Sequence, residues 1–590
     1  MDIPASAGRH WLVPPRDPAA EQRLRAELGV TPLVAATLVA RGLSDPAEAH
    51  TFLNPCLDDL SAPELLPDYA AARDEILGAK ERNDKIFIHG DYDVDGVTSA
   101  ALLSRFLTKI GCDVVTHVPH RMKEGYGIHS SAVEAAAASG AKLFLTCDCG
   151  GSAIEQVAQA RELGMKVVVT DHHSLGEELP QADAVVNPHR VGSRYPFAEL
   201  SGAGVVFRLC EGLATELGFE KSHYRRAYLD LAALGTIADV MPLVGENRII
   251  SRFGLQELSK TKKIGLKAMM AEAKMTPGMH LRGYHVGFVL GPRLNAAGRV
   301  DDAAKALQLL LSTDVLESAK LAAEIECKNQ ERKDEQHRIL GEAIELVQEQ
   351  GAHEKNVIVI AKQGWHTGVI GIVAGRLVEI FRRPTFVLSL GEDGFCKGSA
   401  RSIPKFHLAD AIRAYPELLV GGGHAMAAGC SFPHERLADV VAALHAYAGE
   451  RLTEEDFIPS MWADAEIAAS EVTRESAEEL GKLEPFGCAN PEPMFIARDM
   501  TLAEVAPTRK PEHVRTLLRS EHGTVAAMGF NMGEQITTEM IGAKVDVAFQ
   551  PMLDEYRGIV TLKWRLQDLQ ASSSASVLPV PEPLEVPALA

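Results

Sequence analysis

A short acidic segment, Lys85-Ile-Phe-Ile-His-Gly-Asp-Tyr-Asp-Val-Asp-Gly96, limits most strongly what this chain can fold into. The apolar run 86–88 predicts a buried strand, and a helical pattern follows the last glycine. Between them, Asp91, Asp93 and Asp95 place three carboxylates at alternate positions. Like charges a few ångströms apart repel and raise each other's pKa, so these acids need cations. The pattern therefore predicts a metal site at the carboxyl end of a strand in an α/β sheet.

Two plainer interpretations compete with a metal site in a sheet. The pattern Asp-x-Asp-x-Asp-Gly also begins a calcium-binding EF-hand loop, which needs a glutamate at its twelfth position. Counted from Asp91, that position is Leu102, and the preceding segment favours a strand where an EF-hand has a helix. A solvated acidic turn is the other alternative, and we favour the sheet site over both.

Two further strand ends carry polar side chains. The run 142–146 leads into Cys147-Asp148-Cys149-Gly150-Gly151, and the run 166–170 leads into Asp171-His172-His173. Alternating strands and helices predict a parallel, doubly wound sheet, and the carboxyl ends of its strands meet in one crevice. We therefore expect these acids and histidines to lie together with the first acidic segment. The C-x-C pattern at 147–149 favours small buried residues over redox chemistry.

A fourth contributor is Asp239, which ends the apolar helical run 231–239. Taken alone, such an acid is more often a helix-end carboxylate than a ligand. Mixed carboxylate and imidazole ligands suit Mn²⁺ or Mg²⁺ better than a metal that prefers thiolates. We therefore predict a Mn²⁺ or Mg²⁺ site.

The motifs DYDVDG, TCDCG, TDHH and GTIAD occur in this order, and the series resembles the DHH phosphoesterase superfamily. Later segments resemble the RecJ family of bacterial single-stranded-DNA exonucleases: GPRLNAAGR at 291–299, GSARS at 398–402, GGGHAMAAG at 421–429 and LEPFGCANPEPMF at 483–495. The resemblance extends from about residue 80 to residue 570.

The fold expected from pattern and resemblance together is α/β. Two α/β domains, DHH and DHHA1-like, are joined by a long helix around a catalytic cleft, and short strands after Glu455 predict a C-terminal OB-fold barrel. The predicted segments are an N-terminal accessory segment at 1–80, the metal-binding catalytic domain at 81–250, a helical connector at 251–355, a DHHA1-like substrate-binding domain at 356–452, an OB-fold nucleic-acid-binding domain at 453–570 and a disordered tail at 571–590.

The resemblance implies 5′-to-3′ hydrolysis of single-stranded DNA to 5′-mononucleotides, in recombination and repair. We expect two-metal catalysis, in which cations about 3.5–4 Å apart activate water and bind the scissile phosphate. The implied metal ligands are His89, Asp93, Asp95, Asp148, His172 and Asp239. Asp148 is suited to bridging. The residues expected to act catalytically are His173 at the scissile phosphate, Asp91 in the outer shell and Asp171 as a support for the histidines.

Substrate binding is expected from arginines beside small residues, where backbone N–H groups and the guanidinium fork can both reach phosphate. The net charge of −20 argues against nonspecific coating of duplex DNA but permits a local positive channel. The resemblance places recognition of a 5′-terminal phosphate at Arg121, Arg293, Ser399 and Arg401. The candidate substrate-binding residues are Arg121, Arg293, Asn295, Arg299, Ser399, Arg401 and His424, with His120, Lys123 and Lys405 as further cations.

The remaining expectations concern environment and partners. No apolar run is long enough to span a membrane, no secretory signal is evident, and nine scattered cysteines suit a reducing cytoplasm. Single-strand-binding protein and a helicase are plausible partners by family, and the chain is expected to be a monomer. Two alternatives stay open: a DHH phosphodiesterase acting on nanoRNA or cyclic dinucleotides, and a catalytically inactive replication scaffold, which the intact motifs disfavour.

Overall fold

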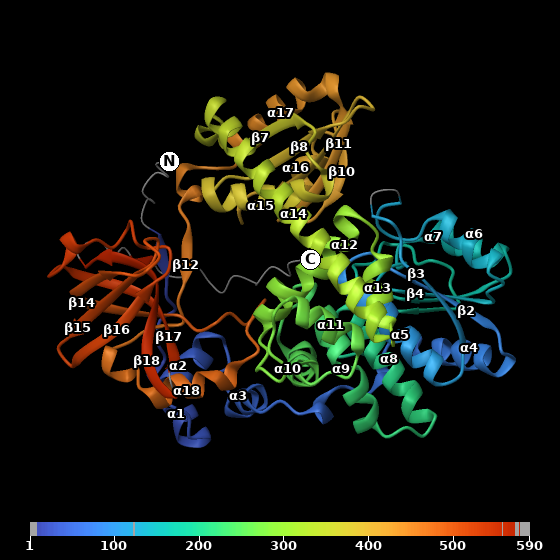
Figure 1. The fold of residues 1–590 in the computed structure, drawn as a ribbon, viewed down its shortest axis with the longest axis horizontal. Coiled ribbons are helices and arrows are strands. Elements are labelled where there is room, and N and C mark those ends of the chain that lie inside the picture. Colours follow the sequence, from blue (N-terminus) through green and yellow to red (C-terminus); the bar gives the residue numbers. More distant parts are fainter. Residues whose placement is uncertain (1–8, 122–123, 557, 573–576, 579–590) are drawn as a thin grey trace. The chain divides into compact units, whose positions relative to one another are not determined.

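The computed structural model describes residues 9–121, 124–556, 558–572 and 577–578, without the side chains of Tyr556, Val577 and Leu578. Lys123 and most of the predicted tail lie outside this part. The chain divides into two compact units (Figure 1). Cys56–Thr453 with Gly487–Asn490 forms one, here the α/β unit; the chain up to Pro55, Glu454–Phe486 and the chain from Pro491 form the other, here the barrel unit.

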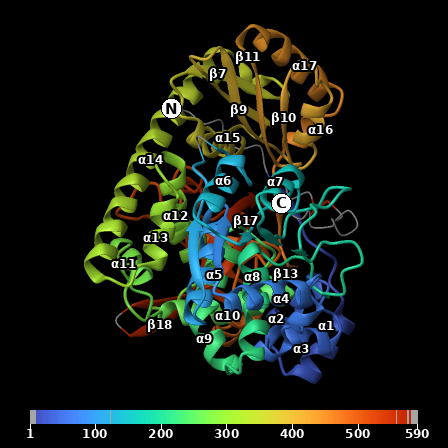
Figure 2. The same ribbon diagram turned by 90° about the vertical axis from the view of Figure 1, so that its right-hand side faces the viewer.

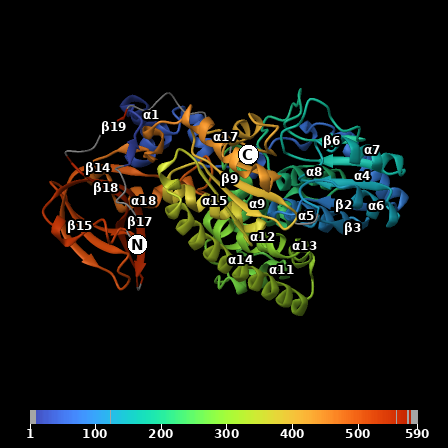
Figure 3. The ribbon, with the colours of Figure 1, turned by 90° about the horizontal axis from the view of Figure 1, so that it is seen from above.

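The first sheet of the α/β unit is parallel throughout, in the order β3-β2-β4-β5-β6. Ile86 and Ile88 of β2 pack in the core that holds α5 and α8, whereas Phe87 packs with α6 and α7 on the other face (Figure 3). The predicted doubly wound sheet is therefore confirmed. Its elements are α4 Tyr69–Arg82, β2 Lys85–Gly90, α5 Val94–Lys109, β3 Asp113–His117, α6 Ser130–Ala138, β4 Leu143–Cys147, α7 Ile154–Glu162, β5 Lys166–Thr170, β6 Ala184–Val186 and α8 Gly202–Glu216.

Helices follow this sheet and lead to the second one. The predicted connector is helical but consists of several helices, and one of them ends at Leu311. A new helix begins there because the Asp314 carboxylate accepts a hydrogen bond from the Glu317 N–H and caps the first turn. The helices are α9 Lys221–Ala238, α10 Gly245–Ser259, α11 Ile264–Glu272, the π-helix η3 His285–Leu290, α12 Gly291–Val300, α13 Ala304–Leu311 and α14 Val315–Glu349.

The second sheet of the α/β unit has the order β10-β11-β9-β8-β7, with only β7 and β8 parallel. Helix α15 packs against β8 and β9, and α16 packs against β10 and β11 (Figure 2). The elements are β7 Ile358–Gln363, α15 Thr367–Phe381, β8 Thr385–Leu390, β9 Phe395–Arg401, α16 Leu408–Arg413, β10 Val420–Gly423, β11 Ala427–Pro433 and α17 Leu437–Gly449.

The barrel unit contains the predicted C-terminal barrel, closed where β14 pairs with β17. Its strands are longer than the sequence suggested, because irregular registers near Met500 and Leu502 interrupt the alternation of apolar residues without ending β14. Phe549 and Trp564 stack at the centre of its core. The elements are β12 Ser460–Trp462, β13 Ala465–Glu466, α18 Arg474–Leu480, β14 Phe495–Pro507, β15 Val514–Ser520, β16 Gly523–Gly529, β17 Lys544–Tyr556, β18 Ile559–Ala571 and β19 Val577–Leu578.

The N-terminal residues belong to the barrel unit. Strand β1 runs parallel to β12 and β19, and the buried Trp11 indole donates a 2.8 Å hydrogen bond to Asp568. The N-terminal segment is therefore part of the barrel's structure. Its elements are β1 His10–Leu12, α1 Pro18–Leu28, α2 Pro32–Ala40 and α3 Pro46–Leu53.

We expect Trp11→Ala to lower the free energy of unfolding of the barrel unit by about 3–5 kcal/mol, because it leaves a cavity and removes the indole hydrogen bond to the Asp568 carboxylate. Trp462→Ala is the matched control, since Trp462 lies in the same small sheet and is partly exposed. Denaturant unfolding followed by circular dichroism measures both. Equal effects of the two substitutions would contradict a structural role for the N-terminal strand.

Candidate metal centre and anion site

The acidic turn after β2 is fixed by helix ends. Asp93 caps α5 by accepting a hydrogen bond from the Gly96 N–H at 3.0 Å. Asp95 accepts hydrogen bonds from the N–H groups of Gly202 and Ala203, at 2.6 and 2.9 Å, where α8 begins. Unpaired N–H groups at a helix N-terminus favour negative charge, so α8 stabilises the ionised form of Asp95.

Asp148, directly after β4, has a strained backbone. Its φ of 61° lies in the left-handed region, which non-glycine residues seldom adopt. The conformation is held by a 3.0 Å hydrogen bond from its N–H to the Thr170 carbonyl. A Cβ on Gly202 would lie 2.6 Å from Oδ1 of Asp148, so this carboxylate needs a glycine at the start of α8. Strain of this kind at a buried acid favours a functional role.

The segment after β5 is organised by Asp171. Its Oδ1 accepts hydrogen bonds from the N–H groups of His172 and His173 and lies 2.8 Å from Nδ1 of His173. Its Oδ2 accepts from the Gly151 N–H at 2.7 Å. Asp171 therefore fixes both histidines and the turn after β4, and its two oxygens are engaged in doing so.

His172 faces the carboxylates. Its Nε2 lies 3.1 Å from Asp148, 3.6 Å from Asp239 and 3.8 Å from Asp95. Among the described residues, three groups of side chains hold possible metal-ligand atoms that lie within 4.8 Å of one another. They are Asp148, His172 and His173; Asp95, His172 and Asp239; and Asp91, Asp93 and Asp148.

Three buried polar atoms of this cluster indicate whether a cation fits there. Oδ1 of Asp91, Oδ1 of Asp148 and Nε2 of His172 are buried and have no hydrogen-bond partner among the described residues. Unpaired buried polar atoms of this kind cost free energy unless something else satisfies them. Carboxylate oxygens with one or two imidazoles are the donors that Mn²⁺ and Mg²⁺ accept. The residues present therefore fit a divalent cation.

The electrostatics agree with this fit. Burial, then the charge of Asp93, raises the pKa of Asp95 to about 7. Burial and neighbouring carboxylates, most strongly Asp95, hold the pKa values of Asp148 and Asp239 well above the usual range. Burial and the charge of Asp93 also raise the pKa of Asp91 well above its usual value. Without a cation, the folded protein therefore resists full ionisation of this cluster.

The two histidines differ in charge preference. Burial lowers the pKa of His172 to about 3, which leaves its imidazole neutral and able to ligate a metal. Burial also lowers the pKa of His173, but the hydrogen bond and charge of Asp171 outweigh it and the net shift is upward. His173 is also 42% exposed at its side chain, so it is the histidine that substrate can reach.

His89 lies outside the three groups. Its Nδ1 is 3.2 Å from Nδ1 of His117, its Nε2 is 3.2 Å from the Gly127 carbonyl, and the two imidazoles stack. Burial lowers the pKa of His89 to about 3, so it is a neutral buried ring. The structure does not bring it to the carboxylates, and its role as a ligand stays a prediction.

Three predicted phosphate-binding arginines form a positive cluster, here the arginine cluster: Arg121, Arg299 and Arg401. Burial, then the charges of Arg121, Arg332 and Arg401, lowers the pKa of Arg299 to about 9. Burial, then the charge of Arg121, lowers the pKa of Arg401 on β9. Arg299 donates to the Gly368 carbonyl at 3.1 Å, and Arg401 donates to its neighbour's carbonyl at 2.8 Å. Mutually repelling, half-buried cations without an acidic partner among the described residues suit an anion site, and this role stays a prediction.

The other residues predicted to contact substrate lie in α12 and in the second sheet or its β10–β11 turn. Ser399 lies two residues before Arg401 on β9, and both face Gly371 of α15 at about 3.4 Å from where a Cβ would stand. Arg293 is engaged in an ion pair with Glu326 at 2.6 Å. Asn295 is half-buried on α12, and His424 is exposed in the turn between β10 and β11. Their contacts with substrate stay predictions.

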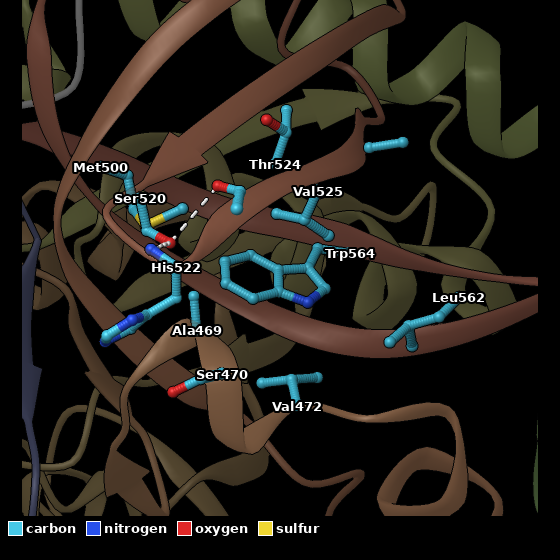
Figure 4. Close-up of a pocket in the computed structure, with 12 residues that line it drawn as sticks. Ala469, Ser470, Val472, Met500, Ser520, His522, Thr524, Val525, Leu562 and Trp564 are labelled. Carbon is cyan, nitrogen blue, oxygen red and sulfur yellow. Dashed lines mark hydrogen bonds between the residues drawn. The ribbon is translucent and has the colours of Figure 1, made fainter.

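Phe530, Tyr556 and Trp564 are the aromatic residues of the barrel that the sequence offers for stacking on bases, although each alone would more often be a core residue. Trp564 is 1% exposed and stacks on Phe549 with ring centroids 3.6 Å apart, so it belongs to the core. Its indole lines a pocket of about 250 Å³. Figure 4 shows Val525 and His522 lining the same pocket. Phe530 is 44% exposed and meets His513 edge to face. The Tyr556 side chain lies outside the described part.

The structure adds residues that sequence reasoning missed. Oη of Tyr126 lies 3.1 Å from Nδ1 of His173, and the two rings meet edge to face. The fully buried Asn187 donates to the His173 carbonyl at 2.9 Å and accepts from the His189 N–H. The glycine-flanked Glu124-Gly-Tyr-Gly127 pattern could have indicated Tyr126. Nothing local indicates Asn187, because its role depends on β6 lying beside β5.

Three protein-family models match this chain. The model of the DHH family, N-terminal domain, matches residues 85–236, the DHHA1 domain matches 354–450, and the RecJ OB domain matches 463–568. The two α/β domains and the metal centre thus define a DHH-type protein, and its barrel is of the RecJ type. Among the described residues, no helix is long and apolar enough to cross a membrane.

Similar proteins of known family identify the family of this chain. The chain is 38% identical to the single-stranded-DNA-specific exonuclease RecJ of Bacillus subtilis, over 95% of this chain and 72% of that protein. It is 34% identical to the RecJ of Dickeya dadantii, over 92% of this chain and 96% of that protein. The crystal structure of Thermus thermophilus RecJ in complex with Mn²⁺ superposes with a TM-score of 0.82 at 29% identity, covering 95% and 79% of the two chains. This chain belongs to the RecJ family.

We expect Mn²⁺ to stabilise the protein more at high pH than at low pH. A carboxylate whose folded pKa is raised stabilises the metal-free fold below about pH 4 and loses this contribution as pH rises through the folded pKa, about 7 for Asp95. A cation needs the ionised carboxylates, so it restores most stability above that value. Thermal unfolding with EDTA or Mn²⁺, at pH 5.5 and pH 8, measures the difference. An equal Mn²⁺-dependent rise in Tm at both pH values would contradict a carboxylate site.

Proposed function

We propose that this protein is a metal-dependent exonuclease that degrades single-stranded DNA from its 5′ end and releases 5′-mononucleotides. The observation that carries the proposal is the clustering, at the strand ends of a DHH domain and at the end of α9, of six side chains: Asp91, Asp93, Asp95, Asp148, His172 and Asp239. Membership of a family whose relatives are named single-stranded-DNA-specific exonucleases supports the substrate.

The metal centre would hold two Mn²⁺ or Mg²⁺ ions. Two of the ligand groups share no residue: Asp95, His172 and Asp239, and Asp91, Asp93 and Asp148. Asp148 also lies within reach of His172, which suits it to bridge the two positions. Crystal structures of Thermus thermophilus RecJ with Mn²⁺ and with Mg²⁺ support the choice of metal. When bound, the ions supply an activated water at neutral pH and stabilise charge on the phosphate.

The residues around the centre have separate tasks. The neutral His172, whose Nε2 has no hydrogen-bond partner among the described residues, would bind the cation, whereas the more exposed His173 would face substrate. Asp171 holds Nδ1 of His173, so Nε2 of that imidazole is left to donate a hydrogen bond to the phosphate or to carry a proton. Tyr126 packs against the same ring from the exposed side. The upward pKa shift of His173 favours the charged donor.

The arginine cluster would determine the end from which the strand is degraded. Arg121 is close enough to Asp91 to lower the pKa of that carboxylate, so the cluster lies beside the metal centre. Arg121, Arg299 and Arg401, with Ser399, would bind the 5′-terminal phosphate while the next phosphodiester meets the metal centre. Guanidinium forks suit the terminal phosphate because it carries more charge and more free oxygens than a diester.

The barrel is expected to track the rest of the strand, as OB-folds do through cations and stacked bases. Within recombination and repair, single-strand-binding protein and a helicase are the partners we expect, and we expect the protein to act as a monomer in the cytoplasm. Nine unpaired cysteines support a reducing compartment. The intact acid cluster disfavours a scaffold, and the matched RecJ OB domain disfavours a phosphodiesterase of short nucleotides.

The first test follows single-stranded DNA labelled separately at each end, with Mn²⁺ or EDTA. We expect mononucleotides from the 5′ end, only with metal and only from single strands. Asp95→Ala should reduce the rate by several orders of magnitude, because it removes a metal ligand. Asp113→Ala, an exposed acid at the start of β3, is the matched control. Turnover of dinucleotides without long strands would instead support a small-substrate phosphodiesterase.

Arg401→Ala should weaken the preference for phosphorylated 5′ ends more than it slows catalysis at saturating substrate. A lost bidentate contact made equally in the ground and transition states raises KM and leaves kcat nearly unchanged. We expect about a 10- to 100-fold rise in KM for the phosphorylated strand, from the about 1.5–3 kcal/mol of a charge-assisted hydrogen bond. Arg436→Ala, an exposed arginine in the same domain, is the control. Equal losses on phosphorylated and 5′-hydroxyl strands would refute this role.

A further inference from the structure

Tyr92 stands between the two sites described above. It is the residue between Asp91 and Asp93, so its backbone belongs to the metal-binding turn. Its ring packs on the core of the first sheet and is half-buried. The Arg121 guanidinium lies over that ring, 4.7 Å from the centroid. One short turn thus carries metal ligands by its carboxylates and contacts an arginine by its aromatic ring.

The ring is the contact that orients Arg121. Within the described part of the chain, no hydrogen bond or ion pair holds the Arg121 guanidinium. Arg121 also repels Arg299 and Arg401, which would drive a free side chain away from them. The negative face of an aromatic ring attracts a guanidinium, and more strongly where water is excluded. Tyr92 therefore offsets part of the repulsion that the arginine cluster creates.

Tyr92 also lies beside Arg299. The charge of Arg299 acts on Tyr92, and the Tyr92 carbonyl would be 3.2 Å from a Cβ placed on Gly298, so α12 approaches the turn closely. Arg299 follows directly on that helix. Two members of the arginine cluster are thus placed relative to the same aromatic residue.

We propose that Tyr92 is a positioning residue for 5′-end recognition: its ring holds Arg121 in the arginine cluster and so fixes where the terminal phosphate binds relative to the metal centre. This inference rests on the proposed function, because it assumes that the arginine cluster binds that phosphate. Tyr92, between Asp91 and Asp93, would thereby have a task in substrate selection. A core-filling role alone requires no effect on selection.

The test compares Tyr92→Leu with Tyr92→Phe. Leucine keeps apolar packing and loses the aromatic face, whereas phenylalanine keeps the face and loses only the hydroxyl. For each protein, kcat and KM are measured with Mn²⁺ on the same single strand carrying a 5′-phosphate or a 5′-hydroxyl. Mn²⁺ binding and Tm show whether the turn and the fold are intact. Tyr447→Leu, which removes the ring under Arg451, is the matched control.

We expect Tyr92→Leu to reduce the preference for the phosphorylated strand by about 3- to 30-fold through KM, with Mn²⁺ binding retained. Tyr92→Phe and Tyr447→Leu should keep the preference of the unsubstituted protein. An unchanged preference in Tyr92→Leu would overturn the inference and leave the proposed function standing. A fall in kcat on both strands alike would overturn it too, since that result indicates a damaged metal turn. If the unsubstituted protein does not prefer the phosphorylated strand, end recognition by the arginine cluster is itself wrong.

Discussion

The repulsion among buried carboxylates is the constraint on which the rest of this structure depends. Asp91, Asp95, Asp148 and Asp239 are drawn together where water is scarce, and burial raises the pKa of each. Unpaired buried charge is costly, so such a cluster exists only because the surrounding fold enforces it. The N-terminus of α8, the left-handed backbone at Asp148 and the hydrogen bonds of Asp171 are the means of enforcement.

Much of this could be predicted where the signal is local. Strands β2, β4 and β5 are continuous apolar runs, and such runs predict buried parallel strands whose ends converge. The structure brings together the acids and histidines directly after them, as this reasoning predicts. His89 lies beside its β3 neighbour His117, and its role as a ligand stays a prediction.

Other features depend on contacts between distant parts of the chain. Strand β1 pairs with β12, 450 residues later, and no local pattern in the first fifty residues indicates that partner. The extent of β14 was missed because irregular registers break the period of two that marks a strand. Asn187 and Tyr92 carry ordinary local signals for a strand end and a core ring. Their importance comes from what packs beside them, His173 in one case and Arg121 in the other.

The two charge clusters also bear on the proposal that this acidic chain selects a nucleic-acid end. A net charge of −20 repels a polyanion at long range, but salt screens that repulsion beyond about 8–10 Å. At short range, the proposed site would offer the terminal phosphate Arg121, Arg299 and Arg401, whose mutual repulsion an anion would relieve. The carboxylates beside them are tolerable to DNA only when cations neutralise them. In the proposed mechanism, metal binding and end binding would therefore reinforce each other, because cations at the carboxylates remove negative charge that would otherwise repel the phosphate bound at the arginines.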